Sequence, residues 1–336
     1  MSNKEEYEKI LEIVDVNQYS GEKEFVDNCA TKFKNVRNAF YIVLFTELFY
    51  LMIKDIFIDE NIFLSLIILS LTLVVILSYL KQRKILYREL NTYLFRECYP
   101  DKGLSRYVNF IPMMLKKQIL WSKVHYNMGI GLYYMGDITR ASKMLSLMQD
   151  SCTTANDMIL ALYLKQLIAL YYMDMDEVIG CANDARILHP KASQASYVQK
   201  AYSDIQTYGD YANYYINHDM EHIYQLFGSA YERPLDEVKR HFYLYKAAKE
   251  CNDLQNINTF SGFVSANAGT TWYGSAITDG FVPVVKPDNY PAFIADQDRL
   301  NNPSKIDNSR KKYILLGVVA VLIMYLISYT IKTFNL

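Results

Sequence analysis

The amino-acid sequence predicts an all-α protein in which an N-terminal transmembrane hairpin and a C-terminal transmembrane helix flank a cytosolic helical domain. Hydrophobic residues make up 51% of the 336 positions and charged residues 21%. The mean hydropathy of -0.04 is typical of apolar segments joined to a polar globular part. Apolar residues recur at helical steps of three and four, and the alternation typical of strands is scarce. The predicted segments are an amphipathic helix, a hairpin, a helical domain, an irregular juxtamembrane segment and a C-terminal span, at 1–38, 39–80, 81–257, 258–312 and 313–336.

The first segment contains an amphipathic helix over residues 22–40. Its apolar side chains follow one another at three- and four-residue steps and form one stripe: Phe25, Val26, Cys29, Phe33, Val36 and Phe40. We expect this helix to run on into the first span. Its stripe suits either a membrane or partner surface, or packing on the cytosolic domain.

The hairpin over 39–80 consists of two apolar stretches joined by a short polar connection at 54–61. The stretch 62–80 has 19 residues without a charge, close to the ~20 needed to cross a bilayer in helical form. The stretch 39–53 is shorter and contains Glu47. Placing a carboxyl group inside a membrane costs free energy and usually serves a function, so Glu47 is a candidate functional residue. The alternative is a structural role, in which Glu47 is hydrogen-bonded within the bundle near Ser65, Ser70 or Thr72.

The segment 81–257 is predicted to form helical hairpins separated by short turns. The tetrapeptide Leu132-Tyr133-Tyr134-Met135 recurs as Leu170-Tyr171-Tyr172-Met173, 38 residues later. Each copy is followed by an acidic turn and another helix. Repeats of this length are the mark of helical solenoids.

The first copy resembles the tetratricopeptide repeat family. The residues that carry the resemblance are Met128-Gly129, Leu132, the turn Gly136-Asp137, Ala141 and Leu145. Small residues suit Gly129 and Ala141 because the two helices of one hairpin are expected to touch there. The second copy keeps Ala185 and Pro190 at the family's spacing but has Leu167 in place of the glycine.

The resemblance implies a concave groove, lined by the first helix of each hairpin, that takes a peptide segment of a partner. The positions on this face are Lys123, Tyr126, Ile130, Tyr133, Tyr134, Ile168, Tyr171 and Tyr172. The alternative is that the tyrosines only pack between helices, because aromatic stripes at helical spacing usually belong to a core.

The two C-terminal segments differ in composition. Four of the eight prolines fall within 258–312, which predicts an irregular stretch that is functional or a linker. The stretch 313–331 is again apolar and free of charge over 19 residues, and it is the third predicted span.

Basic residues near the span ends predict the orientation, because Lys and Arg remain on the cytoplasmic side. They precede the first span, follow the second and precede the third: Lys32, Lys34 and Arg37; Lys81, Arg83, Lys84 and Arg88; Arg310, Lys311 and Lys312. We therefore expect a multi-pass protein of the cell membrane with its N-terminus and 81–312 in the cytosol. The five cysteines form no C-x-x-C pair, which favours free thiols.

One motif of the sequence matches a known catalytic pattern. His218, Glu221 and His222 have the H-x-x-E-H order of inverted zinc peptidases, in which two histidines one helical turn apart bind zinc. A downstream carboxylate ligand would have to be Asp296 or Asp298, since the last glutamate is Glu250. No phosphate-binding loop or nucleophile-elbow motif is present.

Taken together, these features predict a non-enzymatic, membrane-anchored adaptor or assembly subunit without a cofactor. Its expected partners are a protein or peptide and membrane lipid. The 35 basic and 36 acidic residues give a net charge of -1, which argues against nucleic acid as a partner. Two alternatives stay open, namely a membrane zinc peptidase and an accessory subunit of a transport or secretion complex with Glu47 in the transport path.

Overall fold

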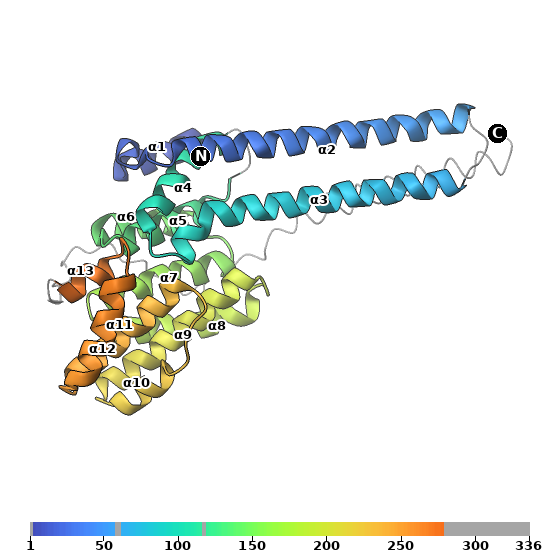
Figure 1. Ribbon diagram of the computed structural model, residues 1–336. Helices are drawn as coiled ribbons and strands as arrows, with labels where there is room; N and C mark the ends of the chain where they lie inside the picture. Colours follow the sequence, from blue (N-terminus) through green and yellow to red (C-terminus); the bar gives the residue numbers. More distant parts are fainter. Residues whose placement is uncertain (1–2, 58–61, 116–118, 279–336) are drawn as a thin grey trace.

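A computed structural model describes residues 3–57, 62–115 and 119–278 of the chain, and these residues form helices without a strand. The all-α prediction is thereby confirmed for the described part. A long pair of helices, α2 (Lys23–Phe57) and α3 (Ile62–Phe95), extends away from a helical body that comprises α4 to α13 (Figure 1). The predicted span at 313–336 lies outside the described residues, as does most of 258–312.

Helices α2 and α3 are antiparallel neighbours along the hairpin. Phe40 of α2 stacks on Tyr79 of α3 with ring centroids 4.9 Å apart, and Phe33 lies 6.1 Å from the same ring. The predicted helix 22–40 does continue into the stretch that follows it, because α2 is one element to Phe57. Glu47 lies within α2, but its side chain is outside the described residues.

Large apolar side chains of the hairpin are exposed on both helices. They are Tyr41, Ile42, Phe45 and Phe49 of α2 and Leu71, Leu73, Val74, Leu77 and Leu80 of α3. Judged on the described residues alone, the length and apolarity required for a membrane crossing are not found together in any helix.

The start of α2 packs on the body instead of facing away from it. Val26 and Cys29 are buried, and the guanidinium of Arg106 in α4 (Pro100–Met114) lies 3.6 Å from the ring centroid of Phe25. The amphipathic stripe therefore begins as a packing surface. Before it, the segment 1–38, which the sequence predicts as an amphipathic helix, also contains a separate helix, α1 (Asn3–Ile13), and the 3-10 turn η1 (Val16–Tyr19).

The body contains four helical hairpins. They are α5 (Trp121–Tyr134) with α6 (Ile138–Ser151), α7 (Ala155–Tyr171) with α8 (Met175–Leu188), α9 (Ser196–Ile216) with α10 (Met220–Leu226), and α11 (Pro234–Glu250) with α12 (Leu254–Asn267). Each hairpin turns through three residues, of which the middle one has positive φ: Gly136, Met173, His218 and Asn252. The third is always an aspartate whose side chain accepts the backbone N–H three residues on: Asp137, Asp174, Asp219 and Asp253. In each hairpin the residue with positive φ thus ends the first helix, and the aspartate caps the start of the second.

These turns define how the first two hairpins correspond. Asp137 and Asp174 are 37 positions apart, one fewer than the 38 that separate the two Leu-Tyr-Tyr-Met copies. The last residue of α5 is Tyr134 and that of α7 is Tyr171, so these two tyrosines are structurally equivalent. In this register Gln166, rather than Leu167, takes the place of Gly129.

Gly129 lies where helices approach closely. A Cβ added there would be 2.4 Å from Cδ2 of Leu164 in α7 and 3.4 Å from Cβ of Met144 in α6. The tightest contact therefore comes from the next hairpin and only the second from the same one. Gln166 is fully buried in the second hairpin, and its Nε2 donates to the carbonyl oxygens of Val178 and Ile205.

Helix continues past residue 257, where the sequence predicted irregular chain. α12 runs to Asn267 and α13 (Trp272–Thr278) follows it. The indole of Trp272 packs edge-on against Tyr133 and Tyr171, with ring centroids 6.0 and 5.0 Å away. Aromatic packing thus orders this part of the segment, and α13 covers the two tyrosines.

Candidate functional site

A cavity of ≈ 520 Å³ lies where the end of α3 meets α5, α7, α9 and α11. Its volume is within the range of about 300–1,000 Å³ typical of ligand pockets. Aromatic and charged side chains both line it. The charged residues are Arg88, Arg96, Lys123, Lys200, Asp204, Arg233, Asp236 and Lys239; the aromatic residues are Tyr87, Phe95, Tyr126, Tyr134, Tyr163 and Tyr197.

The floor of the cavity is a buried network of ion pairs. Nζ of Lys239 lies 2.7 Å from Oδ1 of Asp236 and 3.5 Å from the hydroxyl oxygen of Tyr163. Nζ of Lys200 lies 2.6 Å from Oδ1 of Asp204 and 3.4 Å from Oδ2 of Asp236. The Tyr163 hydroxyl donates to Asp204. Two cations and two carboxylates therefore compensate one another, and α7, α9 and α11 are joined through them.

Both partners of the central pair are ionised at neutral pH. Burial by itself would lower the pKa of Lys239, but the Asp236 carboxylate and the surrounding tyrosine hydroxyls raise it well above its usual value. Burial would raise the pKa of Asp236, yet Lys239 and Lys200 bring it below its usual value. Burial raises the pKa of the Tyr126 and Tyr163 hydroxyls well above normal, so these groups remain neutral hydrogen-bond donors.

The mouth of the cavity, formed by Arg88, Arg96 and Lys123, differs from the floor in its balance of charges. Among the described residues, no acidic side chain forms an ion pair with Arg88, Arg96 or Lys123. Nζ of Lys123 lies 4.4 Å from the ring centroid of Tyr197. A ligand that enters therefore meets uncompensated positive charge first and a neutral polar floor behind it.

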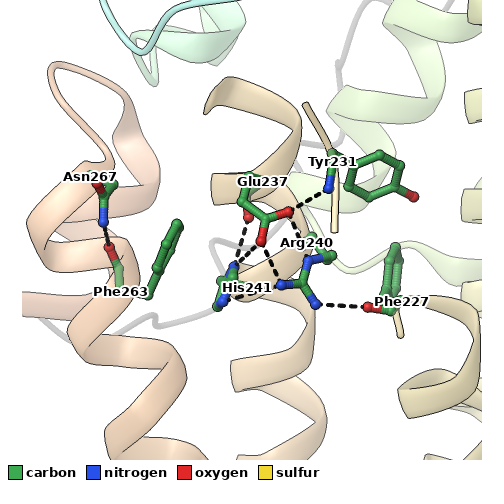
Figure 2. A network of polar contacts seen from close by, with 7 residues as sticks. All are labelled: Phe227, Tyr231, Glu237, Arg240, His241, Phe263 and Asn267. Atoms are coloured by element: carbon green, nitrogen blue, oxygen red, sulfur yellow. Dashed lines mark hydrogen bonds and ion pairs between the residues drawn. The ribbon is translucent and has the colours of Figure 1, made fainter. Parts of the chain in front are cut away.

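A second polar network holds the loop between α10 and α11 beside the cavity, and Figure 2 shows it. The Glu237 carboxylate accepts the backbone N–H of Tyr231 at 2.9 Å and is paired with Arg240. Arg240 also donates to the carbonyl oxygen of Phe227 at 2.9 Å. His241 stacks on Phe263 of α12 with ring centroids 3.7 Å apart. Together these contacts fasten the loop that places Tyr231 5.8 Å from the ammonium of Lys200.

The predicted partner-binding residues are distributed over three environments. Lys123, Tyr126 and Tyr134 line the cavity. Ile130, Tyr133 and Ile168 are fully buried and do not line it. Tyr171 and Tyr172 border a separate open hollow that also contacts Tyr19 and Arg140.

The sequence does not predict the charged floor of the cavity, although two of its ion pairs have the spacing of neighbours on a helix. Asp236 and Lys239 are three positions apart on α11, and Lys200 and Asp204 are four apart on α9, so each pair shares a helix face. Such pairs are usually exposed. Only the packing of α7, α9 and α11 reveals that the two pairs meet, with Asp236 and Lys239 buried and Lys200 and Asp204 partly buried.

The H-x-x-E-H residues do not have the arrangement that the zinc-peptidase motif requires. α10 begins at Met220, so His218 precedes the helix and has a φ of 55°. Nδ1 of His222 lies 2.7 Å from Oδ2 of Asp219, and its side chain is 53% exposed. The motif is a helix N-cap, in which the two histidines are not on successive turns of one helix. No group of three or more His, Cys, Asp or Glu in the described part of the chain could hold a metal ion. Asp296 and Asp298 lie outside that part.

Comparisons of the chain with protein-family models, with curated proteins and with solved structures found no match. The resemblance to tetratricopeptide repeats therefore stays a prediction.

Proposed function

We propose that the protein is a membrane-anchored adaptor without enzymatic activity. The α2–α3 hairpin inserts into the membrane, and a peptide segment of a partner protein binds in the cavity. The observation that carries the proposal is that α3 connects the two features: five of its apolar side chains from Leu71 to Leu80 are exposed, and its end, from Tyr87 to Phe95, forms one wall of the cavity.

The anchor is supported by the exposed side chains of the hairpin. Burying one large apolar side chain is favourable by about 1.5–3 kcal/mol, and such side chains are exposed on both helices. The stretch 62–80 within the hairpin and the stretch 313–331 carry no charge, and both are spans in this proposal. In this proposal the helical body lies on the cytosolic side of the cell membrane, an orientation that the basic residues beside the spans favour.

Partner binding is supported by the chemistry of the cavity. Its floor is already neutralised by its own ion pairs, so a ligand need not supply a charge there. Arg88, Arg96 and Lys123 at the mouth favour a segment with negative charge. Tyrosine side chains offer large contact area and a hydroxyl donor at low entropic cost, as in other protein interfaces.

The proposal is tested by photo-crosslinking in native membranes. A photoreactive phenylalanine analogue replaces Tyr197 at the mouth, which is 44% exposed. The control carries it at Ile187 of α8, which is 47% exposed and does not line the cavity. We expect one discrete protein adduct at position 197, none at 187, and loss of the adduct when Lys123→Glu is added. Adducts at both positions, or at neither, would contradict partner binding in the cavity.

Anchoring is measured separately in the same membranes. Alkaline carbonate extraction should leave the chain in the membrane pellet, and release into the supernatant would contradict it. The accessory-subunit alternative differs in one respect, because it requires Glu47 in the transport path. Glu47→Gln would abolish transport in that case while leaving the crosslinked adduct unchanged.

A further inference from the structure

The Phe40–Tyr79 stack divides the α2–α3 hairpin into two halves of opposite character. Because the helices are antiparallel (Figure 1), residues before Phe40 on α2 lie beside residues after Tyr79 on α3. Phe33, two helical turns before Phe40, also contacts the Tyr79 ring, with ring centroids 6.1 Å apart. Beyond the stack, away from the body, lie exposed apolar side chains of both helices, namely Tyr41, Ile42, Phe45 and Phe49 of α2 and Leu71, Leu73, Val74 and Leu77 of α3.

On the body side of the stack, basic residues surround the hairpin. We name the set Lys32, Lys34, Arg37, Lys81, Arg83, Lys84 and Arg88 the cationic collar. All except Arg37 are exposed. The sequence has no Asp or Glu between residues 28 and 46 or between 62 and 88, and no collar residue forms an ion pair with a described acidic side chain.

We infer that the cationic collar binds the phosphate headgroups of anionic membrane lipids. The inference rests on the proposed insertion of the hairpin and names the lipid that this insertion selects. Lys81 directly follows the exposed Leu80, and the collar residues Lys81 to Arg88 span about 10 Å of helix at 1.5 Å per residue. The headgroup layer begins where the hydrocarbon ends and is about 5–8 Å deep on each side.

The arrangement favours a lipid surface over a soluble polyanion. A nucleic acid or an acidic protein would neutralise the collar but would leave the adjacent Leu77 and Leu80 exposed. A bilayer covers both at once, because its apolar and anionic layers lie in the same order as on the hairpin. The rings of Phe40 and Tyr79 lie at the boundary, where membrane proteins concentrate tyrosine.

The test measures lipid selectivity of the full-length protein in nanodiscs. Spin-labelled phosphatidylglycerol and phosphatidylcholine are compared for motionally restricted lipid in a phosphatidylcholine bilayer. We expect the anionic label to be preferred by about fivefold or more, on the scale of the attraction of basic residues to anionic surfaces. High salt should weaken the preference.

Charge variants identify the collar as the source. The variant Lys81→Gln, Arg83→Gln, Lys84→Gln should lower the preference to below about twofold. The control Lys143→Gln, Lys191→Gln, Lys249→Gln removes three charges from exposed positions of the body and should leave it unchanged. Equal association of the two labels, or an equal fall in the control, would overturn the inference while the anchoring stands. A chain that enters no bilayer would instead overturn the anchoring, and the collar inference with it.

Discussion

Lys239 and Asp236 form an ion pair at 2.7 Å with side chains that are only 5% and 9% exposed. A buried pair of this kind adds little stability compared with apolar residues, but losing one partner leaves an uncompensated charge. The pair therefore positions helices α7, α9 and α11 around the cavity more than it strengthens the fold.

Asp236→Asn should lower the free energy of unfolding by about 3–5 kcal/mol, because Lys239 loses its carboxylate. The double variant Asp236→Asn, Lys239→Met should cost less than the sum of the single changes. Urea unfolding of the detergent-solubilised chain, followed by circular dichroism, gives these values. Lys200→Met is the control, since its side chain is 34% exposed and a smaller loss is expected. Additive single effects would show that the two charges are not coupled.

Tyr134→Ala and Tyr172→Ala should differ in their effect on stability. Tyr134 is buried and equivalent to Tyr171 at the end of its helix, so removing its ring should cost about 3–5 kcal/mol. Tyr172 is only partly buried, and its loss should cost clearly less. Thermal unfolding of both variants tests this. Similar melting temperatures in the two variants would contradict the burial difference.

Lys246 should make stability depend on pH between about 7 and 9. Burial lowers its pKa to about 7, so in this window the unfolded state binds a proton that the folded state does not. The free energy of unfolding should therefore rise with pH, by at most about 1.4 kcal/mol per pH unit. Lys246→Met should flatten the rise and stabilise the protein at pH 7. Denaturant unfolding at several pH values measures both effects, and an unchanged slope in the variant would assign the rise to other groups.

Acid should destabilise the protein through Asp236. Its folded-state pKa lies below the usual value because the pull of Lys239 and Lys200 exceeds the effect of burial. The stabilisation is therefore complete above the unfolded pKa, near 4, and is lost as pH falls through the folded pKa. Stability measured from pH 6 down to pH 2 should decline less steeply in Asp236→Asn than in the wild type. Parallel curves would exclude this carboxylate as the cause.

His218→Gly should stabilise the protein by up to about 1 kcal/mol, because glycine adopts the positive φ of 55° without strain. Asp219→Ala should destabilise it by about 1 kcal/mol through loss of the helix cap. Thermal melting with and without added zinc checks both. A stabilisation by zinc that His218→Gly abolishes would falsify the assignment of this motif to a helix cap.

Much of the local structure could be predicted from the sequence, because it depends on neighbouring residues. Helical periodicity predicted the all-α class. The helix predicted over 22–40 was also correctly expected to continue into the stretch that follows it. The turn Gly136-Asp137 was identified by residue types that suit a positive φ and a helix cap. The sequence predicted an offset of 38 residues between the first two hairpins, whereas their turns are 37 residues apart. The repeated tyrosines are more conspicuous in the sequence than the aspartates that cap the second helices, and they suggested the wrong register.

The sequence by itself therefore determined the all-α class, the turn at Gly136-Asp137 and the separation of apolar from basic residues along the hairpin. Only the tertiary structure decided that Tyr133 is core and covered by Trp272, while Lys123 and Tyr126 line a cavity. It also decided that Tyr163, Asp204 and Lys239, from three different helices, meet in one network. The physical reason is that a helical period specifies which residues share a face, whereas the neighbour of that face depends on how distant helices pack.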